Sequence, residues 1–418
     1  MSETRYLRRG AWLLGAVTVG GFATDYLFNL GLARFLDPHG YGDFKVAFSF
    51  AFFFGMAVLL GGDRAAPMVL APSIERGERR RVWAYLRFYL GNAMLLSVGL
   101  AAVVWTASWL HVGSSDAEHH HALAWAVLVV PLNAVAAMVS RTLQSAQRPA
   151  LAVLPWRIAL PLLQLVLLAV WVAWRGSVEV LEAIGIATVV TLFLTLLQWA
   201  WVRRLKLVEV VADPDRRRSR DWLASSLPMM GSFLVALALN QSDVYFLEML
   251  GDEAEVGKYA AAATAAHLVL LVQTTVIGLV APIAKRAIDQ GGDDERATYR
   301  RSQGLLVKLA IPVAVLLALA ADPVLALFGP EYRAAHTVLL FLTLGNLTWA
   351  LAAVPSLWLQ YRGRAHSVLA ISIATLIVDS ALNLVLIPRY GMAGAAAGTA
   401  FTLSAAALAA ILVRRRAA

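Results

Sequence analysis

The 418-residue chain contains no cysteine and little charge, since Lys, Arg, Asp and Glu together make up 15% of it. The absence of cysteine excludes disulfides, thiolate metal sites and a cysteine nucleophile. Soluble domains are about 25% charged and about 45–50% apolar, whereas this chain is 60% apolar. This composition predicts a protein whose helices lie in lipid.

The chain also lacks the motifs of nucleotide-driven and metal-dependent enzymes. It has no G-x-x-x-x-G-K-[ST] phosphate loop, no H-E-x-x-H motif and no polar segment long enough for a soluble domain. His111 and the run His119–His121 could ligate a metal, but a metal site needs converging ligands and a supporting shell of hydrogen bonds. We therefore expect no enzymatic activity, no metal site and no cofactor.

Long apolar runs fill most of the sequence and predict an all-α, polytopic membrane protein. A bilayer-spanning helix needs about 20 mostly apolar residues. The first run is too long for a signal peptide, so we expect it to be the first span. Hydropathy predicts twelve spans, at residues 11–33, 43–62, 84–107, 122–143, 151–174, 180–202, 223–247, 256–281, 305–327, 335–358, 367–387 and 393–413.

Basic residues are distributed unequally between the two ends of these spans. If the N-terminus is cytoplasmic, all but six of the 36 Lys and Arg residues fall on the cytoplasmic side; the six are Arg34, Lys45, Arg175, Lys258, Arg333 and Arg389. Because Lys and Arg are retained on that side of short loops, we expect both termini to be cytoplasmic. The net charge of +9 then reflects membrane topology rather than nucleic-acid binding.

The longest polar interruption follows the sixth predicted span. This stretch, residues 203–222, is expected to be a cytoplasmic basic linker between an N-terminal six-helix lobe (1–202) and a C-terminal six-helix lobe (223–418). The segments "FLDPHGYGDF" and "MLGDEAEVGKY" place Gly42 and Gly257 at matching positions in the two halves. An even number of spans in each half predicts a parallel repeat, with a substrate path between the lobes.

Polar residues deep in three spans form the first set of candidate site residues. A charged side chain at the centre of a bilayer helix costs about 2.5–3.5 kcal/mol or more, so such residues usually face a cavity or a partner. Each pair has the spacing that shares a helix face: the pairs are Asp25 and Asn29, Asn240 and Asp243, and Asp379 and Asn383. They either line a hydrophilic cavity and couple transport to an ion, or join helices through hydrogen bonds.

Basic residues near the cytoplasmic ends of spans form the second set. They are Arg64, Arg87, Arg141 and Arg157 in the first lobe, with Lys308 and Arg362 in the second. A guanidinium group binds phosphate oxygens bidentately, so these residues could form a cationic vestibule for a phosphate or pyrophosphate group. The alternative is that each side chain extends to the membrane surface, as the excess of Lys and Arg on the cytoplasmic side already predicts.

Four segments, in order along most of the chain, carry a family resemblance. They are "LARFLDPHGYGDFKVAFSFAFF", "NQSDVYFLEMLGDEAEVGKYAAAA", "LFGPEYRAA" and "LNLVLIPRYGMAGAAAGTAFT". Together they resemble the polysaccharide flippases of the multidrug/oligosaccharidyl-lipid/polysaccharide (MOP) exporter superfamily. Asp243, Gly257 and Tyr259 stand at family-like positions within them.

The resemblance implies two six-helix lobes around a central cavity. It implies a flippase that moves polyprenyl-pyrophosphate-linked oligosaccharides, the repeat units of O-antigen, capsule or exopolysaccharide, from the inner to the outer leaflet of a prokaryotic plasma (inner) membrane by alternating access. Expected partners are the lipid-linked substrate, membrane lipid, a polysaccharide polymerase, glycosyltransferases and a proton or sodium gradient, with no nucleic acid.

Three other functions stay open from the sequence. The first alternative is an ion-coupled small-molecule exporter of the same superfamily, in which the acidic residues rather than the arginines would recognise the substrate. A membrane enzyme acting on lipid-linked sugars is the next, and a scaffold without transport activity is the last.

Overall fold

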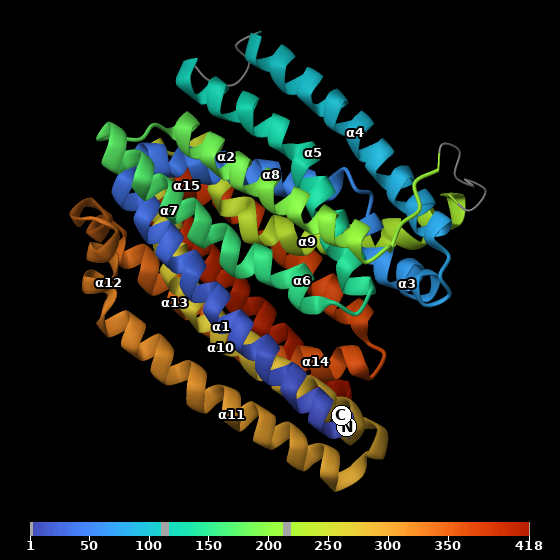
Figure 1. Cartoon of the computed structure of the whole chain (residues 1–418). Helices are drawn as coiled ribbons and strands as arrows, with labels where there is room; N and C mark the ends of the chain where they lie inside the picture. The colour runs from blue at the N-terminus through green and yellow to red at the C-terminus, as the bar shows by residue number, and fades with distance from the viewer. Residues whose placement is uncertain (1–2, 110–116, 212–218, 418) are drawn as a thin grey trace. The chain divides into compact units, whose positions relative to one another are not determined.

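A computed structural model describes residues 3–109, 117–211 and 219–417, which form helices and contain no strand (Figure 1). In lipid the backbone N–H and C=O groups must pair within their own segment, which is why apolar runs fold as helices. Nine helices in these ranges are long and apolar enough to cross a membrane, or ten if the bent pair Pro38–Ala57 and Gly62–Glu75 is one span. The predicted all-α polytopic fold is confirmed, and the count of twelve spans stays a prediction.

The chain forms two compact units. Unit 1 contains the chain up to Gly42 together with the chain from Leu239 onward, and unit 2 contains Asp43–Ala238. Two helices, α2 (Pro38–Ala57) and α9 (Ser219–Leu250), therefore belong partly to each unit. The division into six-helix lobes at the basic linker stays a prediction.

Unit 1 is built from long helices that pack through small side chains. Five alanines of α10 are buried, which allows neighbouring backbones to approach closely; they are Ala260, Ala261, Ala262, Ala265 and Ala266. Its other helices are α1 (Glu3–Phe35), α10 (Glu253–Gln290), α11 (Gly292–Leu319), α12 (Ala321–Phe328), the 3-10 helix η2 (Pro330–Ala335), α13 (His336–Leu351), α14 (Ala353–Tyr361) and α15 (Ala365–Ala417). The first helix, α1, packs against α10, and α13 packs against both α10 and α15.

The longest helix, α15, is two helices joined at a break. Gly391 has non-helical dihedral angles (φ 55°, ψ −139°) and lies between the two predicted spans 367–387 and 393–413. On the far side of the break, the backbone N–H of Met392 donates a 2.8 Å hydrogen bond to Oε2 of Glu255 on α10. A side chain from a neighbouring helix thus satisfies one of the amides that the break exposes.

The two glycines at matching positions of the sequence repeat lie beside each other in unit 1. A Cβ on Gly257 of α10 would stand 2.0 Å from the carbonyl oxygen of Pro38 and 3.2 Å from the backbone nitrogen of Gly42. Only glycine allows this close approach between the start of α10 and the start of α2. In Figure 1 the start of α1 and the end of α15 lie at the same end of unit 1, as an even number of crossings requires. The assignment of that end to the cytoplasm stays a prediction.

Unit 2 contains most of α2, the beginning of α9 and the helices between them. These are α3 (Gly62–Glu75), α4 (Arg79–Trp109), α5 (Ala117–Ser145), α6 (Pro149–Leu154), the π-helix η1 (Pro155–Ala159), α7 (Leu160–Arg175) and α8 (Val180–Arg204). Its core gathers aromatic side chains, including Tyr85 and Tyr89 on α4 and Trp222 on α9. The bend of 47° between α2 and α3 interrupts one apolar segment of this unit.

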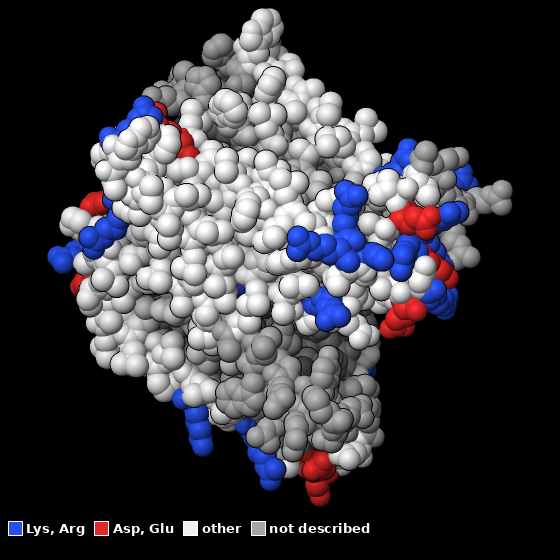
Figure 2. Space-filling model, viewed as in Figure 1, with Lys and Arg blue, Asp and Glu red and all other residues white. Residues whose placement is uncertain are grey.

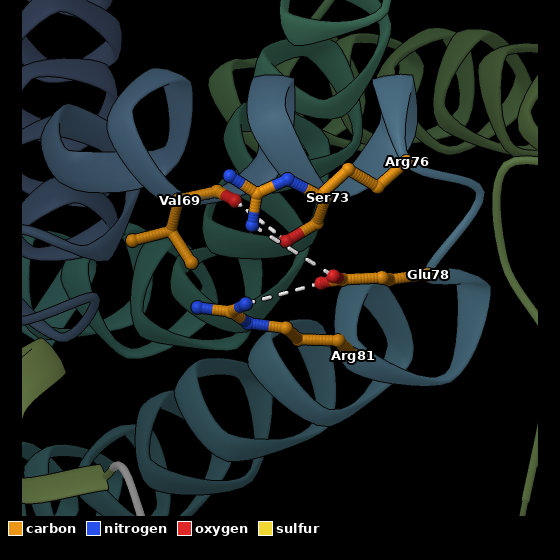
Figure 3. A network of polar contacts seen from close by, with 5 residues as sticks. All are labelled: Val69, Ser73, Arg76, Glu78 and Arg81. Atoms are coloured by element: carbon orange, nitrogen blue, oxygen red, sulfur yellow. Dashed lines mark hydrogen bonds and ion pairs between the residues drawn. The ribbon is translucent and has the colours of Figure 1, made fainter.

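The turn from α3 to α4 carries one of the basic clusters of the sequence. Glu78 lies between two arginines, 3.0 Å from Nη1 of Arg81 and 3.9 Å from Nη1 of Arg76 (Figure 3). In Figure 2, Lys and Arg side chains gather with Asp and Glu at the end of unit 2 where α3 lies in Figure 1. Paired charges at a helix end are typical of a segment that leaves the bilayer.

Candidate functional site

A cluster of buried polar side chains joins α9 and α15 in unit 1. The side-chain amide of Asn383 donates hydrogen bonds of 2.8 Å to Oδ1 of Asp243 and 3.2 Å to Oδ2 of Asp379. All three residues are buried, with relative exposures of 8% or less. The sequence had placed these residues in the seventh and eleventh spans, and the structure brings them together.

Hydroxyl groups complete this cluster. Thr399 donates a 2.8 Å hydrogen bond to Oδ2 of Asp243, and the hydroxyl of Tyr259 on α10 donates to the same oxygen. Asp379 accepts hydrogen bonds from Thr402 at 3.0 Å and from Ser242 at 3.1 Å. We call Ser242, Asp243, Tyr259, Asp379, Asn383, Thr399 and Thr402 the acidic cluster.

The acidic cluster is rich in oxygen and contains no cationic partner among the hydrogen bonds of its described residues. Every group that donates a hydrogen bond to Asp243 or Asp379 is an uncharged amide or hydroxyl. The side-chain oxygen of Asn383 is buried and has no hydrogen-bond donor within the described part of the chain. Carboxylate, amide and hydroxyl oxygens are the ligands of hard cations, and carboxylates buried in spans also carry protons.

The second polar pair predicted from the sequence lies on α1. Asn29 is buried and donates to the backbone oxygen of Asp25 at 2.8 Å and to its Oδ2 at 3.3 Å. Its side-chain oxygen accepts a 3.2 Å hydrogen bond from the hydroxyl of Tyr41. Asp25 itself is exposed, and the side chain of Asn240 lies outside the described residues.

Two of the predicted cations of unit 2 interact with the same carboxylate. Nε of Arg64 on α3 is 3.0 Å from Oδ2 of the adjacent Asp63, and its guanidinium stands 3.4 Å from the centre of the Phe233 ring on α9. Arg141 on α5 interacts electrostatically with both Asp63 and Arg64. Arg141 also donates a 2.6 Å hydrogen bond to Gln144. The cation group of unit 2 therefore consists of Arg64 and Arg141 with one carboxylate.

The other two predicted cations of unit 2 occupy different places. Arg87 on α4 donates to the carbonyl oxygen of Val211 at 3.4 Å, beside Trp83, whose indole N–H donates to the same oxygen at 3.0 Å. These bonds hold the first residues of the basic linker against α4, as does the 2.8 Å ion pair between Arg80 and Glu209. Arg157 lies in the π-helix η1 and is exposed.

The two predicted cations of unit 1, Arg362 and Lys308, have different neighbours. Arg362, at the end of α14, pairs with the buried carboxylate of Glu295 on α11, with Nη2 2.8 Å from Oε1 and 2.9 Å from Oε2. Lys308 on α11 is exposed between Leu305 and Leu309, which are exposed as well. A lone lysine on an exposed apolar face is the arrangement expected of a side chain that extends to the membrane surface.

No metal-binding group of three or more His, Asp or Glu side chains occurs among the described residues. The candidate ligands His111 and His119–His121 lie outside the described side chains. Within the described part of the chain, the acidic cluster of unit 1 and the cation group of unit 2 are the sites that bring sequence-predicted polar residues together.

Three solved structures share this fold over nearly the whole chain. An inward-facing multidrug resistance MATE family transporter of the MOP superfamily is 17% identical, with a TM-score of 0.75 over 96% of this chain and 98% of its own. The lipid II flippase MurJ, in an inward closed conformation, is 13% identical, with a TM-score of 0.78 over 96% of this chain and 87% of its own. A MOP superfamily transporter from Pyrococcus furiosus is 17% identical, with a TM-score of 0.61 over 97% and 95%.

These likenesses define the class: a multi-pass membrane protein with the fold of MOP superfamily transporters. Residues 7–288 match the polysaccharide biosynthesis protein family, and the chain belongs to that family. This confirms the resemblance that the four sequence segments carry. A comparison with curated proteins gave no match.

Four residues of these sites were not candidates in the sequence, and Ser242 is the first, because a lone serine beside Asp243 carries no signal of its own. Thr399 and Thr402 lie in a span rich in alanine and glycine, where hydroxyls ordinarily serve helix packing. Asp63 follows the predicted end of the second span, so it counted as a loop residue rather than a charge in lipid. The sequence does contain one indication that Asp63 lies in a membrane segment: the mostly apolar run continues beyond Gly61 to Pro72.

Proposed function

We propose that this protein is a flippase for polyprenyl-pyrophosphate-linked oligosaccharides in the prokaryotic plasma membrane. The observation that carries the proposal is membership of the polysaccharide biosynthesis protein family, combined with a fold shared with a lipid II flippase. The substrate would be a repeat unit of O-antigen, capsule or exopolysaccharide, moved from the inner to the outer leaflet by alternating access of two lobes.

In this proposal the cation group of unit 2 receives the pyrophosphate. Arg64 and Arg141 offer guanidinium groups, which can bind phosphate oxygens bidentately. By the predicted topology they lie near the cytoplasmic ends of their spans, on the side where the lipid-linked oligosaccharide is made. Arg157 adds an exposed cation in the same unit.

We further propose that the acidic cluster of unit 1 couples transport to a proton or sodium gradient. An interhelical hydrogen bond in a membrane contributes about 0.6 kcal/mol on average, whereas a charged residue at the centre of a span costs about 2.5–3.5 kcal/mol. Helix packing alone therefore gives little reason to keep Asp243 and Asp379 together, and cation or proton binding gives one. The buried oxygen of Asn383, which has no donor among the described residues, supports the same role.

The proposal is tested by deleting the gene and measuring lipid-linked oligosaccharide in both leaflets together with polymer on the cell surface. A flippase predicts loss of surface polymer with intact repeat units accumulating in the inner leaflet. Unchanged polymer, in a strain without a redundant flippase, contradicts it. That result would favour the ion-coupled small-molecule exporter, which the likeness of the fold to MATE transporters makes the second candidate.

A further inference from the structure

A break inside a membrane segment of unit 2 places a carboxylate beside the cation group. Leu60 and Gly61 both have positive φ angles, 50° and 75°, so the chain turns sharply between α2 and α3. A non-glycine residue rarely adopts such an angle, and it persists only where the surroundings hold it. The two residues that follow, Gly62 and Asp63, begin α3 and are buried.

Side chains from two other helices hold this break in place. The hydroxyl of Ser226 on α9 donates a 2.7 Å hydrogen bond to the carbonyl oxygen of Leu60 and accepts one of 2.9 Å from Tyr89 on α4. Tyr85 donates a 2.7 Å bond to the carbonyl oxygen of Gly62. A Cβ on Gly61 would stand 2.2 Å from the carbonyl oxygen of Ser226, so no other residue fits there. The break is therefore a fixed feature that sets the position of Asp63.

The carboxylate of Asp63 is almost completely buried, with 3% of its side chain exposed, and Arg64 beside it is 27% exposed. Burying an ionised carboxylate is unfavourable unless cations and hydrogen bonds compensate for the lost hydration. Arg64 at 3.0 Å, the charge of Arg141 and backbone amides at the start of α3 supply part of this compensation, but burial outweighs them. The carboxylate thus lies against one arginine, Arg64, and within the electrostatic influence of a second, Arg141.

Arg64 keeps unused binding capacity in this arrangement. The buried Nε of Arg64 has no hydrogen-bond acceptor among the described residues, because its approach to Asp63 lacks the alignment of a hydrogen bond. Two guanidinium groups and one carboxylate also leave the group with a net charge of +1. A site with a surplus positive charge and unpaired donors favours a further anion with several oxygens, such as a phosphate or pyrophosphate.

We infer that Asp63 is a built-in competing anion, which holds Arg64 and Arg141 when the site is empty and yields them to the pyrophosphate of the lipid-linked substrate. The inference rests on the proposed function for the identity of that substrate. Once the pyrophosphate has taken both guanidinium groups, Asp63 is a buried carboxylate next to a second anion. Their repulsion weakens substrate binding and promotes release, so Asp63 limits affinity in favour of turnover.

The test is the affinity of the purified full-length protein for inorganic pyrophosphate, measured by calorimetry at about 0.15 M ionic strength, where charges farther apart than about 8 Å are largely screened. We expect Asp63→Asn to bind pyrophosphate at least tenfold more tightly than the wild type, and Asp63→Glu to bind within about threefold of the wild type. A merely structural role for Asp63 predicts weaker binding or none in Asp63→Asn.

Glu75→Gln is the matched control, because it removes a carboxylate at the exposed far end of the same helix. At about 1.5 Å per residue, Glu75 is about 18 Å along the helix from Asp63, so its removal should leave affinity unchanged. Affinity in Asp63→Asn that is equal to or below that of the wild type overturns the inference. If Asp63→Asn does not fold, Asp63→Ser replaces it, because serine also suits the start of a helix.

A further variant keeps the inference falsifiable if neither substitution folds. Arg141→Gln should lower pyrophosphate affinity at least tenfold, and unchanged affinity shows that Asp63 and Arg141 do not share an anion site. Binding of pyrophosphate by purified protein is independent of flipping in cells. Tighter binding in Asp63→Asn with normal leaflet distribution in the gene deletion would uphold this site and contradict the proposed function.

Discussion

The side-chain amide of Asn383 on α15 donates a 2.8 Å hydrogen bond to Oδ1 of Asp243 on α9, although 140 residues separate them in the chain. This bond joins two spans at the centre of the acidic cluster. Because Asn383 is completely buried and its amide also reaches Asp379 at 3.2 Å, one neutral side chain holds two carboxylates together. Loss of either carboxylate therefore changes the charge of the cluster without removing its other hydrogen bonds.

Asp243→Asn should abolish the dependence of transport on the ion gradient while the protein still inserts and folds. The substitution removes a carboxylate that accepts from Asn383 and Thr399 and keeps a side chain of similar shape. We expect transport driven by an imposed proton or sodium gradient to fall at least tenfold in proteoliposomes. Asp294→Asn, at an exposed position at the start of α11, is the control and should retain wild-type transport.

Arg141→Ala and Arg157→Ala, made together, should reduce polymer at the cell surface without reducing the amount of protein in the membrane. The two arginines supply cations to unit 2 near the predicted cytoplasmic ends of their spans. Arg204→Ala, which removes an exposed arginine at the end of α8, serves as the control. Surface polymer at the wild-type level in the double variant would refute a role for these arginines in substrate capture.

Arg362→Gln should destabilise unit 1 rather than change substrate recognition. The substitution leaves Glu295, whose side chain is 11% exposed, without its ion-pair partner. Breaking a buried ion pair costs about 3–5 kcal/mol, and the 31% exposure of Arg362 should reduce the loss to about 2–3 kcal/mol. Thermal unfolding of the purified protein measures the effect, and Glu295→Gln combined with Arg362→Gln should recover part of it. Reduced transport with unchanged unfolding temperature would instead indicate a direct role in transport.

Gly257→Ala should destabilise the protein, whereas Gly278→Ala on the same helix should not. The new methyl group at Gly257 would lie 2.0 Å from the carbonyl oxygen of Pro38, while nothing lies within 4 Å of the corresponding position at Gly278. Overpacking costs about 1–3 kcal/mol, and replacing an exposed helical glycine by alanine stabilises by about 0.5–1 kcal/mol. Equal unfolding temperatures for the two variants would show that α10 does not pack closely on the start of α2.

The sequence predicted which residues are polar within spans but not which of them meet. Asp379 and Asn383 share a face because of their four-residue spacing, and that part follows from helix geometry. Their contact with Asp243 depends on how α9 packs on α15, which no local pattern encodes. Thr399 was missed for the same reason, because a hydroxyl in an alanine-rich span acquires its role only from the carboxylate opposite.

For the predicted cations, the sequence located the residues but could not predict the different surroundings of each. Arginines near span ends were found easily, but the sequence could not separate Arg64, which stacks on Phe233, from Arg362, which pairs with Glu295. Asp63 was missed because the break at Gly61 turns the end of one predicted span into the beginning of a further buried helix. Helix breaks fixed by distant side chains, here Ser226, leave only weak signals in a hydropathy profile.

The central claim is that this protein moves a lipid-linked oligosaccharide across a membrane, and reconstitution tests it most directly. The purified protein would be placed in vesicles with a polyprenyl-pyrophosphate-linked oligosaccharide, and the fraction of oligosaccharide accessible to an external glycan-modifying enzyme would be followed over time. We predict that accessibility rises from about half to nearly complete in vesicles containing the protein. Accessibility that stays at the level of protein-free vesicles, with an imposed ion gradient and correctly folded protein, would contradict the account.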